Sequence, residues 1–147
     1  MFRLDPAFLA TSSEVRALTL CQVRLHLDVR FPWLVLIPRR EGAREVEDLD
    51  QADTARLVEE IVLAGRAVRA IGEALGRPVE KLNIGALGNI TAQLHVHVVG
   101  RRSDDVAWPG PVWSHGRAEP YSDGALEVAR SAASVALRAG ERSNRTR

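Results

Sequence analysis

Hydrophobic and polar residues alternate along residues 21–30, which is the pattern of a β-strand with one buried and one solvated face. The apolar side of the alternation consists of Cys21, Val23, Leu25, Leu27 and Val29. A proline at position 32 interrupts the pattern, because proline cannot donate a hydrogen bond to a central sheet ladder. The apolar run at residues 34–37 ends at a second proline, so it predicts a short buried strand.

A helical period replaces the alternation in the next segment. Acidic residues are concentrated at positions 47–53, where the dipole of a starting helix favours them. Gly76, followed by a proline at position 78, is a typical helix end. The segment therefore predicts one long helix, whose apolar stripe is spaced alternately four and three residues apart and consists of Leu57, Ile61, Ala64, Val68, Ile71 and Leu75.

The second half of the chain predicts two more strands and a last helix. Residues 81–87 and 91–99 have the composition of strands, and the Gly88-Asn89 pair between them is typical of a hairpin turn. Ser122 can cap a helix that we expect to end at Gly140. We therefore predict an α+β fold: an antiparallel sheet of about five strands, one long helix packed on it, and a C-terminal helix. A single domain is expected over 1–140, followed by a disordered tail over 141–147.

Composition excludes several classes of protein. The chain has 147 residues with 20 basic and 19 acidic side chains, so no strong charge favours nucleic acid or a membrane as partner. No apolar run approaches the roughly 18 residues of a membrane span. The single cysteine cannot form an internal disulfide. The first residues carry charge and proline and do not resemble a signal peptide, so we expect a cytoplasmic protein.

The candidate chemistry lies in residues 93–99, where polar and apolar side chains alternate. On a strand, Gln93, His95 and His97 share one face, about 7 Å apart per step, while the residues between them face an apolar layer. Two of the four histidines of the chain thus stand together. An imidazole, with a pKa of about 6.5, serves as both nucleophile and proton carrier near neutral pH.

Three interpretations compete for this histidine pair. It is a solvated pair without function, a pair of metal ligands, or a centre of covalent catalysis. A metal needs a third ligand, and no spacing favours His26 or His115 for that role, so we expect no metal and no cofactor. Covalent catalysis is favoured by Asn83 and by the Gly88-Asn89 pair, because glycine-containing turns expose backbone amides that bind phosphate.

The residues at 93–99 resemble the signature of the histidine triad (HIT) family, in which three histidines alternate with apolar residues. Upstream, Asn83-x-Gly85 and Gly88-Asn89 are similar to the Asn-x-Gly and Gly-Gln-Ser/Thr segments of that family. The chain departs from the pattern twice. Gln93 stands at the first triad position and can form hydrogen bonds but cannot titrate. Trp33 stands where a further histidine is common.

The resemblance implies a nucleotide hydrolase or transferase that acts at the α-phosphate of a nucleoside phosphoanhydride or phosphoramidate. His95 is then the nucleophile that forms a nucleotidyl-histidine. His97 contacts the phosphate and helps to manage the proton of the leaving group, and Gln93 binds a phosphate oxygen. The alternative, which Gln93 keeps open, is a nucleotide-binding or interaction module without catalysis.

The remaining predictions concern the ligand and the partner. The resemblance implies a small-molecule nucleotide as ligand and a homodimer as the assembly. Asn83, Gly88 and Asn89 are expected to bind the nucleotide. Asp28 is expected at the ribose, or alternatively paired with an arginine, and Trp33 at the base, or alternatively packed in the core.

Overall fold

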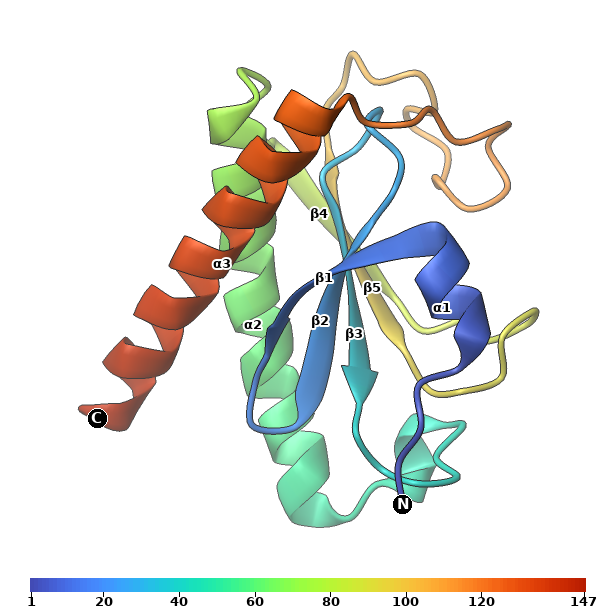
Figure 1. Ribbon diagram of the computed structural model, residues 1–147, viewed down its shortest axis with the longest axis vertical. Helices are drawn as coiled ribbons and strands as arrows, with labels where there is room; N and C mark the ends of the chain where they lie inside the picture. Colours follow the sequence, from blue (N-terminus) through green and yellow to red (C-terminus); the bar gives the residue numbers. More distant parts are fainter.

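A five-stranded antiparallel sheet with the order β1-β2-β3-β5-β4 forms the centre of the protein (Figure 1). The computed structural model describes residues 1–147. The strands are β1 Ser12–Ala17, β2 Cys21–His26, β3 Trp33–Pro38, β4 Lys81–Gly85 and β5 Val96–Arg101. The helices are α1 Pro6–Thr11, α2 Gln51–Ala74 and α3 Asp123–Arg145, with a short 3-10 helix at Val46–Asp48. The predicted α+β class is confirmed, and none of the helices has the length and apolar character needed to cross a membrane.

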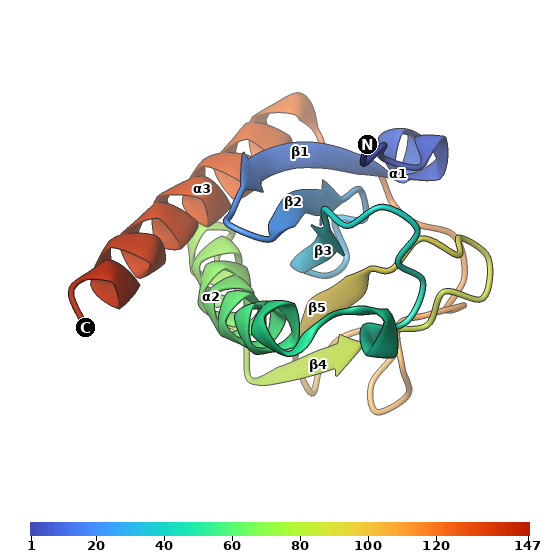
Figure 2. The ribbon, with the colours of Figure 1, turned by 90° about the horizontal axis from the view of Figure 1, so that it is seen from below.

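The main core lies between the sheet and α2, and α3 packs against the outer side of α2 and against β1 (Figures 1 and 2). The alternation in the strands accounts for this face, because every second residue of β2, β3 and β5 points toward α2. The buried strand residues on this side are Cys21, Val23, Leu25, Leu34, Leu36, Val96 and Val98. The predicted helical stripe faces them from α2.

The opposite face of the sheet is also covered, contrary to the solvated face predicted for β2. Helix α1 and the segment that follows β5 enclose a second cluster of buried residues, which consists of Phe8, Phe31, Trp33, Val35, Ile37, Val99, Ala107 and Val112. Arg24 lies on this face and is only 5% exposed. Its guanidinium donates hydrogen bonds to the Ser12 hydroxyl and carbonyl oxygens. The strand itself ends at His26 rather than at residue 30.

The connection between β4 and β5 differs from the predicted hairpin turn. Gly85 pairs with His97, so residues 86–95 form a long loop instead of a two-residue turn at Gly88-Asn89. The strand begins only at Val96 because the residues before it are bonded elsewhere. The Leu94 N–H donates to the Ala43 carbonyl, and the Gln93 side chain binds the N-terminal segment.

Helix α3 begins at the predicted Ser122 cap but ends later than predicted. Asp50 caps α2 and Ser122 caps α3, each by accepting a hydrogen bond from a backbone N–H. Gly140 does not end α3, which continues to Arg145, so residues 141–145 are helical and not a disordered tail. The glycine serves helix packing instead, because a Cβ at Gly140 would lie 2.5 Å from the Leu63 side chain on α2.

A buried carboxylate connects α2 to the sheet, and we expect its loss to destabilise the fold. Glu60 is 2% exposed and accepts hydrogen bonds of 2.8 Å from the backbone N–H groups of Leu20 and Cys21. Replacing Glu60 by alanine leaves two buried donors unpaired, which should lower the free energy of unfolding by about 2–4 kcal/mol in urea titrations. The matched control is Glu59→Ala, which removes only an exposed ion pair with Arg56 and should cost less than about 0.5 kcal/mol. Equal stability of the two variants would contradict the assignment.

Candidate functional site

His97 on strand β5 and His95, just before the strand begins, lie on the face of the sheet that α1 covers. His97 is paired with Val35 on one side and with Gly85 on the other. The ring centroids of His95 and His97 are 4.9 Å apart, with the rings nearly perpendicular. Leu94, Val96 and Val98 face the other way, into the core beneath α2. The structure therefore brings the two imidazoles together as the alternation predicts.

The imidazole of His95 is held by a backbone carbonyl. Its Nδ1 lies 2.7 Å from the carbonyl oxygen of Gln93. Because a carbonyl oxygen only accepts, Nδ1 carries the hydrogen, and the Nε2 of the neutral ring keeps its lone pair. The Phe8 ring of α1 packs edge-on at 4.9 Å and fixes the orientation of the imidazole. In its neutral form, His95 thus presents an oriented lone pair on Nε2.

The imidazole of His97 has the opposite arrangement. The indole Nε1 of Trp33 donates a hydrogen bond of 3.0 Å to His97 Nδ1. Since an indole N–H only donates, Nδ1 is the acceptor and the hydrogen of the neutral ring lies on Nε2. Burial, assisted by His95 and then His26, lowers the pKa of His97 to about 3. His97 is therefore a neutral hydrogen-bond donor at physiological pH.

Two further aromatic side chains, which the sequence did not assign to the site, complete this cluster. The His26 ring stacks on Trp33 at 4.0 Å, and burial lowers the pKa of His26. The Trp113 ring contacts His97 at 5.6 Å and lies over Gly85, where a Cβ would meet it at 3.1 Å. The position of His26 follows from its place on the same strand face as Arg24. No sequence pattern indicates that Trp113 lies at the site, because it belongs to an irregular segment of the chain.

The Gln93 side chain does not lie with the imidazoles. Its Oε1 accepts from the Asp5 N–H, and its Nε2 donates to the Arg3 carbonyl, both at 2.8 Å. In this structure the amide therefore binds the backbone of the N-terminal segment, and its contact with a phosphate stays a prediction. The side chain anchors the N-terminal segment, and only the backbone carbonyl of Gln93 touches His95.

Asp28 and Trp33 have partners inside the fold, in agreement with the alternatives of an arginine pair and core packing. Asp28 is 1% exposed and forms a two-pronged ion pair with Arg30, and it also accepts from the Glu119 N–H. Burial opposes ionisation, but the hydrogen bonds from Arg30 and Glu119 outweigh it and lower the pKa of Asp28. Trp33 is 5% exposed, so it is part of the core and positions His97.

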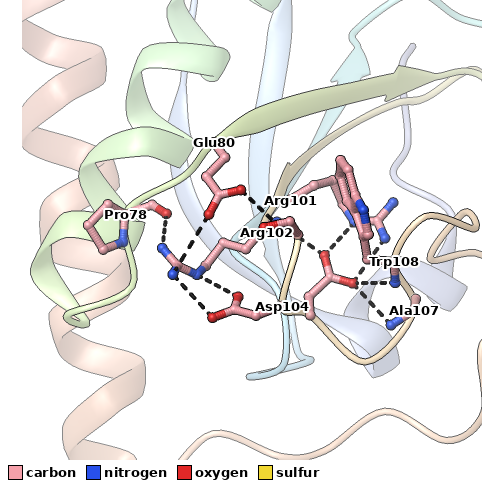
Figure 3. Close-up of polar contacts among 9 residues, drawn as sticks. Pro78, Glu80, Arg101, Arg102, Asp104, Ala107 and Trp108 are labelled. Atoms are coloured by element: carbon pink, nitrogen blue, oxygen red, sulfur yellow. Dashed lines mark hydrogen bonds and ion pairs between the residues drawn. The ribbon is translucent and has the colours of Figure 1, made fainter.

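Asn83 lies on β4, on the same face as His97, and its amide is oriented by a buried arginine. Arg101 Nη1 donates to Asn83 Oδ1 at 2.7 Å, which leaves the N–H groups of the amide as donors. Arg101 is 1% exposed and forms a two-pronged ion pair with Asp105. Figure 3 shows Arg101 beside the Trp108 ring, whose centroid is 5.6 Å from the guanidinium carbon. The carboxylate of Asp105 also accepts from the backbone of the loop after β5, including the Trp108 N–H.

The predicted phosphate-binding pair lies in the loop that leads to His95. Gly88 has a φ of +69°, a conformation that favours glycine, and Asn89 next to it is exposed. A cavity of about 430 Å³ lies elsewhere, beyond the far end of β5, and its lining includes Arg30, Arg77 and Arg102 but none of the predicted site residues. No group of three His, Cys, Asp or Glu side chains is arranged to hold a metal ion.

The protein has an open antiparallel sheet with two imidazoles on one face, of which His95 offers an acceptor nitrogen and His97 a donor nitrogen. Comparison with known proteins gives its family. The model of the HIT domain matches residues 10–104, so the chain belongs to the histidine triad family. It is similar to a histidine triad protein from Sinorhizobium meliloti 1021, with 42% identity, a TM-score of 0.82, and 90% and 95% of the two chains covered.

Two other solved structures are comparably similar. A histidine triad protein from Bradyrhizobium japonicum has 35% identity and a TM-score of 0.86, with 92% of this chain and 98% of that chain covered. One from Marinobacter aquaeolei VT8 has 33% identity and a TM-score of 0.83, with 94% and 97% covered. No protein with curated annotation matches the chain.

The depressed pKa of His97 predicts that acid destabilises the fold. An unfolded histidine takes up a proton near pH 6.5, whereas folded His97 does so only near pH 3. Between these values the unfolded chain binds more protons, so the free energy of unfolding falls by about 1.4 kcal/mol from this residue for each pH unit below 6.5. Urea titrations at about pH 7 and 4.5 should show a smaller loss for His97→Gln than for the wild type. The exposed His115→Gln is the control and should behave as wild type; an unchanged loss in His97→Gln would refute this account.

Proposed function

We propose that the protein is a nucleotide hydrolase or transferase that acts at the α-phosphate through a nucleotidyl-histidine intermediate on His95. The observation that carries this proposal is the hydrogen bond from His95 Nδ1 to the Gln93 carbonyl. It leaves Nε2 as an oriented lone pair that needs no prior deprotonation. Membership of the histidine triad family supports chemistry on nucleotides in general.

The neighbouring donors fit the phosphate of such a substrate. His97 offers its Nε2–H to a non-bridging phosphate oxygen, and the charge that develops there is stabilised by a preoriented donor. The amide N–H groups of Asn83, oriented by Arg101, offer further hydrogen bonds on the same face of the sheet. We assign Gly88 and Asn89 in the loop before His95 to the nucleotide as well.

A nucleotide-binding module without turnover is the second candidate. It is favoured by Gln93, whose amide is committed to Arg3 and Asp5 and brings no titratable group to the imidazole pair. The two candidates differ in whether a covalent adduct forms on His95.

Substitution of His95 separates the two candidates. Incubation with a panel of adenosine and guanosine polyphosphates and phosphoramidates, followed by acid-free quenching, should show a nucleotidyl adduct by intact mass spectrometry. His95→Ala should lose the adduct and at least about 1,000-fold in kcat, as expected for removal of a nucleophile. The exposed His115→Ala is the control for the loss of an imidazole. Nucleotide binding without adduct or turnover in the wild type would establish the second candidate instead.

We also propose that the protein is a homodimer that uses β4 and the adjacent side of α2. Strand β4 is an edge of the sheet, so its outer backbone groups are unpaired within the chain. Apolar side chains are exposed along this edge, with Ile84 at 52% and Val62 of α2 at 50%. The two elements are in contact, because a Cβ at Gly65 of α2 would lie 2.9 Å from the Leu82 side chain of β4 (Figure 2). In a dimer, β4 of a second copy can pair with the free backbone groups of this edge, and the exposed apolar side chains of the two copies can be buried against each other.

Light scattering coupled to size-exclusion chromatography tests the dimer. The wild type should elute with twice the mass of the chain, and Ile84→Arg should elute as a monomer because it places a charge in the interface. Val135→Arg, which changes an equally apolar but exposed residue on α3, should remain a dimer. A monomeric wild type at the concentration of the activity assay would refute the assembly.

A further inference from the structure

The environment of His97 leaves no place for a second proton on its ring. Protonation of Nδ1 would set two N–H donors against each other at 3.0 Å, because the Trp33 indole cannot accept a hydrogen bond. Trp33 cannot turn away to relieve this contact. It is buried, with its ring stacked on His26 at 4.0 Å and edge-on to Phe31 and Trp113 at 6.4 Å each.

The groups that face His97 from the neighbouring elements also oppose a positive charge. His95 from the approach to β5 and His26 from β2 are the titratable side chains that act on it, and both disfavour its cationic form. The aromatic rings in contact with it from β3 and from the segment after β5 are those of Trp33 and Trp113. The carboxylate that acts on His26 is Asp28, which is itself paired with Arg30.

These contacts restrict the movement of protons at the proposed reaction site. His95 uses Nε2 for the attack and keeps its Nδ1–H on the Gln93 carbonyl. His97 can donate a hydrogen bond from Nε2 but cannot transfer that proton without becoming an imidazolate anion. The amide of Gln93, in the place of the first triad histidine, carries no titratable proton. No side chain of the imidazole pair or of position 93 is then able to protonate a leaving group.

We propose that Trp33 is a positioning residue that holds His97 as a neutral Nε2–H donor, and that the site therefore acts on substrates whose leaving group departs without a proton. Such substrates are nucleoside polyphosphates, in which the leaving group is a phosphate anion. Nucleoside phosphoramidates, in which an amine must be protonated to leave, are then poor substrates. The preference for the leaving group rests on the proposed function, whereas the state of the His97 ring does not.

The reaction balances without a general acid. The lone pair of His95 Nε2 forms a bond to the α-phosphorus, and the bond from phosphorus to the bridging oxygen breaks. The electron pair leaves with the bridging oxygen and the phosphate chain attached to it, which is stable as an anion near neutral pH. Water then attacks the phosphorus, the bond to Nε2 breaks, and the proton released from the water passes to the solvent. His97 contributes a hydrogen bond to a phosphate oxygen in both steps and returns unchanged.

Nuclear magnetic resonance of the side-chain nitrogens tests the state of His97 without any substrate. In the wild type, His97 should show an unprotonated Nδ1 and a protonated Nε2, and it should remain neutral from about pH 8 to 4. Trp33→Phe removes the indole N–H and keeps an aromatic ring, so His97 should titrate at a higher pH. Trp113→Phe is the matched control, because the Trp113 N–H has no partner; its loss should leave His97 with an unprotonated Nδ1 and a protonated Nε2.

Kinetics test the consequence for the leaving group. At neutral pH the wild-type kcat/KM for an adenosine polyphosphate should exceed that for adenosine 5′-phosphoramidate by at least about 100-fold, the scale of a missing general acid. In Trp33→Phe this ratio should shrink. The kcat/KM for the phosphoramidate should also become dependent on pH, with the same pKa at which His97 titrates in that variant. The ratio is internal to each variant, so a general loss of stability does not produce the effect.

The outcomes distinguish the two proposals. A proton on His97 Nδ1, or titration of wild-type His97 between about pH 5 and 7, overturns the role of Trp33. The expected ring state together with equal rates on both substrates overturns the leaving-group preference alone. The expected ring state without turnover of any nucleotide overturns the proposed function and the preference that rests on it, while the positioning of His97 by Trp33 is supported.

Discussion

The pairing register of β5 is the constraint on which the site depends. His97 lies between Val35 of β3 and Gly85 of β4, and its neighbours Val96 and Val98 fill the core beneath α2. Because side chains alternate across a strand, a slip by one residue would bury His97 against α2 and move Val96 and Val98 to the face that now carries the imidazoles. The apolar packing that stabilises the fold therefore also decides which face carries the imidazoles.

Strand β5 also positions functional side chains other than the two histidines. Its last residue, Arg101, is buried and orients Asn83 on β4, while its ion pair with Asp105 organises the loop that carries Trp108 (Figure 3). A buried ion pair stabilises a structure only when its hydrogen bonds are complete, and here the carboxylate also accepts from backbone N–H groups. Strand β5 thus positions the two imidazoles at its beginning and, through Arg101, the amide of Asn83 at its end.

The apolar parts of the fold could be predicted from the sequence, since they depend on local periodicity. The alternation before Pro32, the apolar run after it, the stripe from Leu57 to Leu75 and the separation of His95 and His97 from the valines all follow from period and burial. The failures have a common physical cause, which is contact between residues far apart in the chain. Gly140 lies inside a helix because it meets Leu63. Likewise β5 starts late because Gln93 and Leu94 bond to distant backbone groups.

The predicted site residues divide in the same way. His95 and His97 could be found because their spacing alone brings them to one face. For Asp28 and Trp33 the resemblance implied a ligand contact, with an arginine pair and core packing as the alternatives, and in the structure each side chain has a partner inside the fold. For Asp28 that partner is the Arg30 guanidinium two residues away, and for Trp33 it is the ring of His97 on another strand. Residue type indicates which bonds a side chain can make, and only the tertiary structure decides which of them it makes.

The two departures from the family pattern act on the same pair of imidazoles. The side chain of Gln93 holds Asp5, which caps the helix that carries Phe8, and Phe8 packs on His95. Trp33 holds His97 directly. At both positions the histidine of the family pattern is replaced by a side chain that forms hydrogen bonds but carries no titratable proton. The site therefore keeps a fixed acceptor on His95 and a fixed donor on His97. In the proposed reaction no side chain of this pair protonates a leaving group, so the proposed substrates are those whose leaving group departs without a proton.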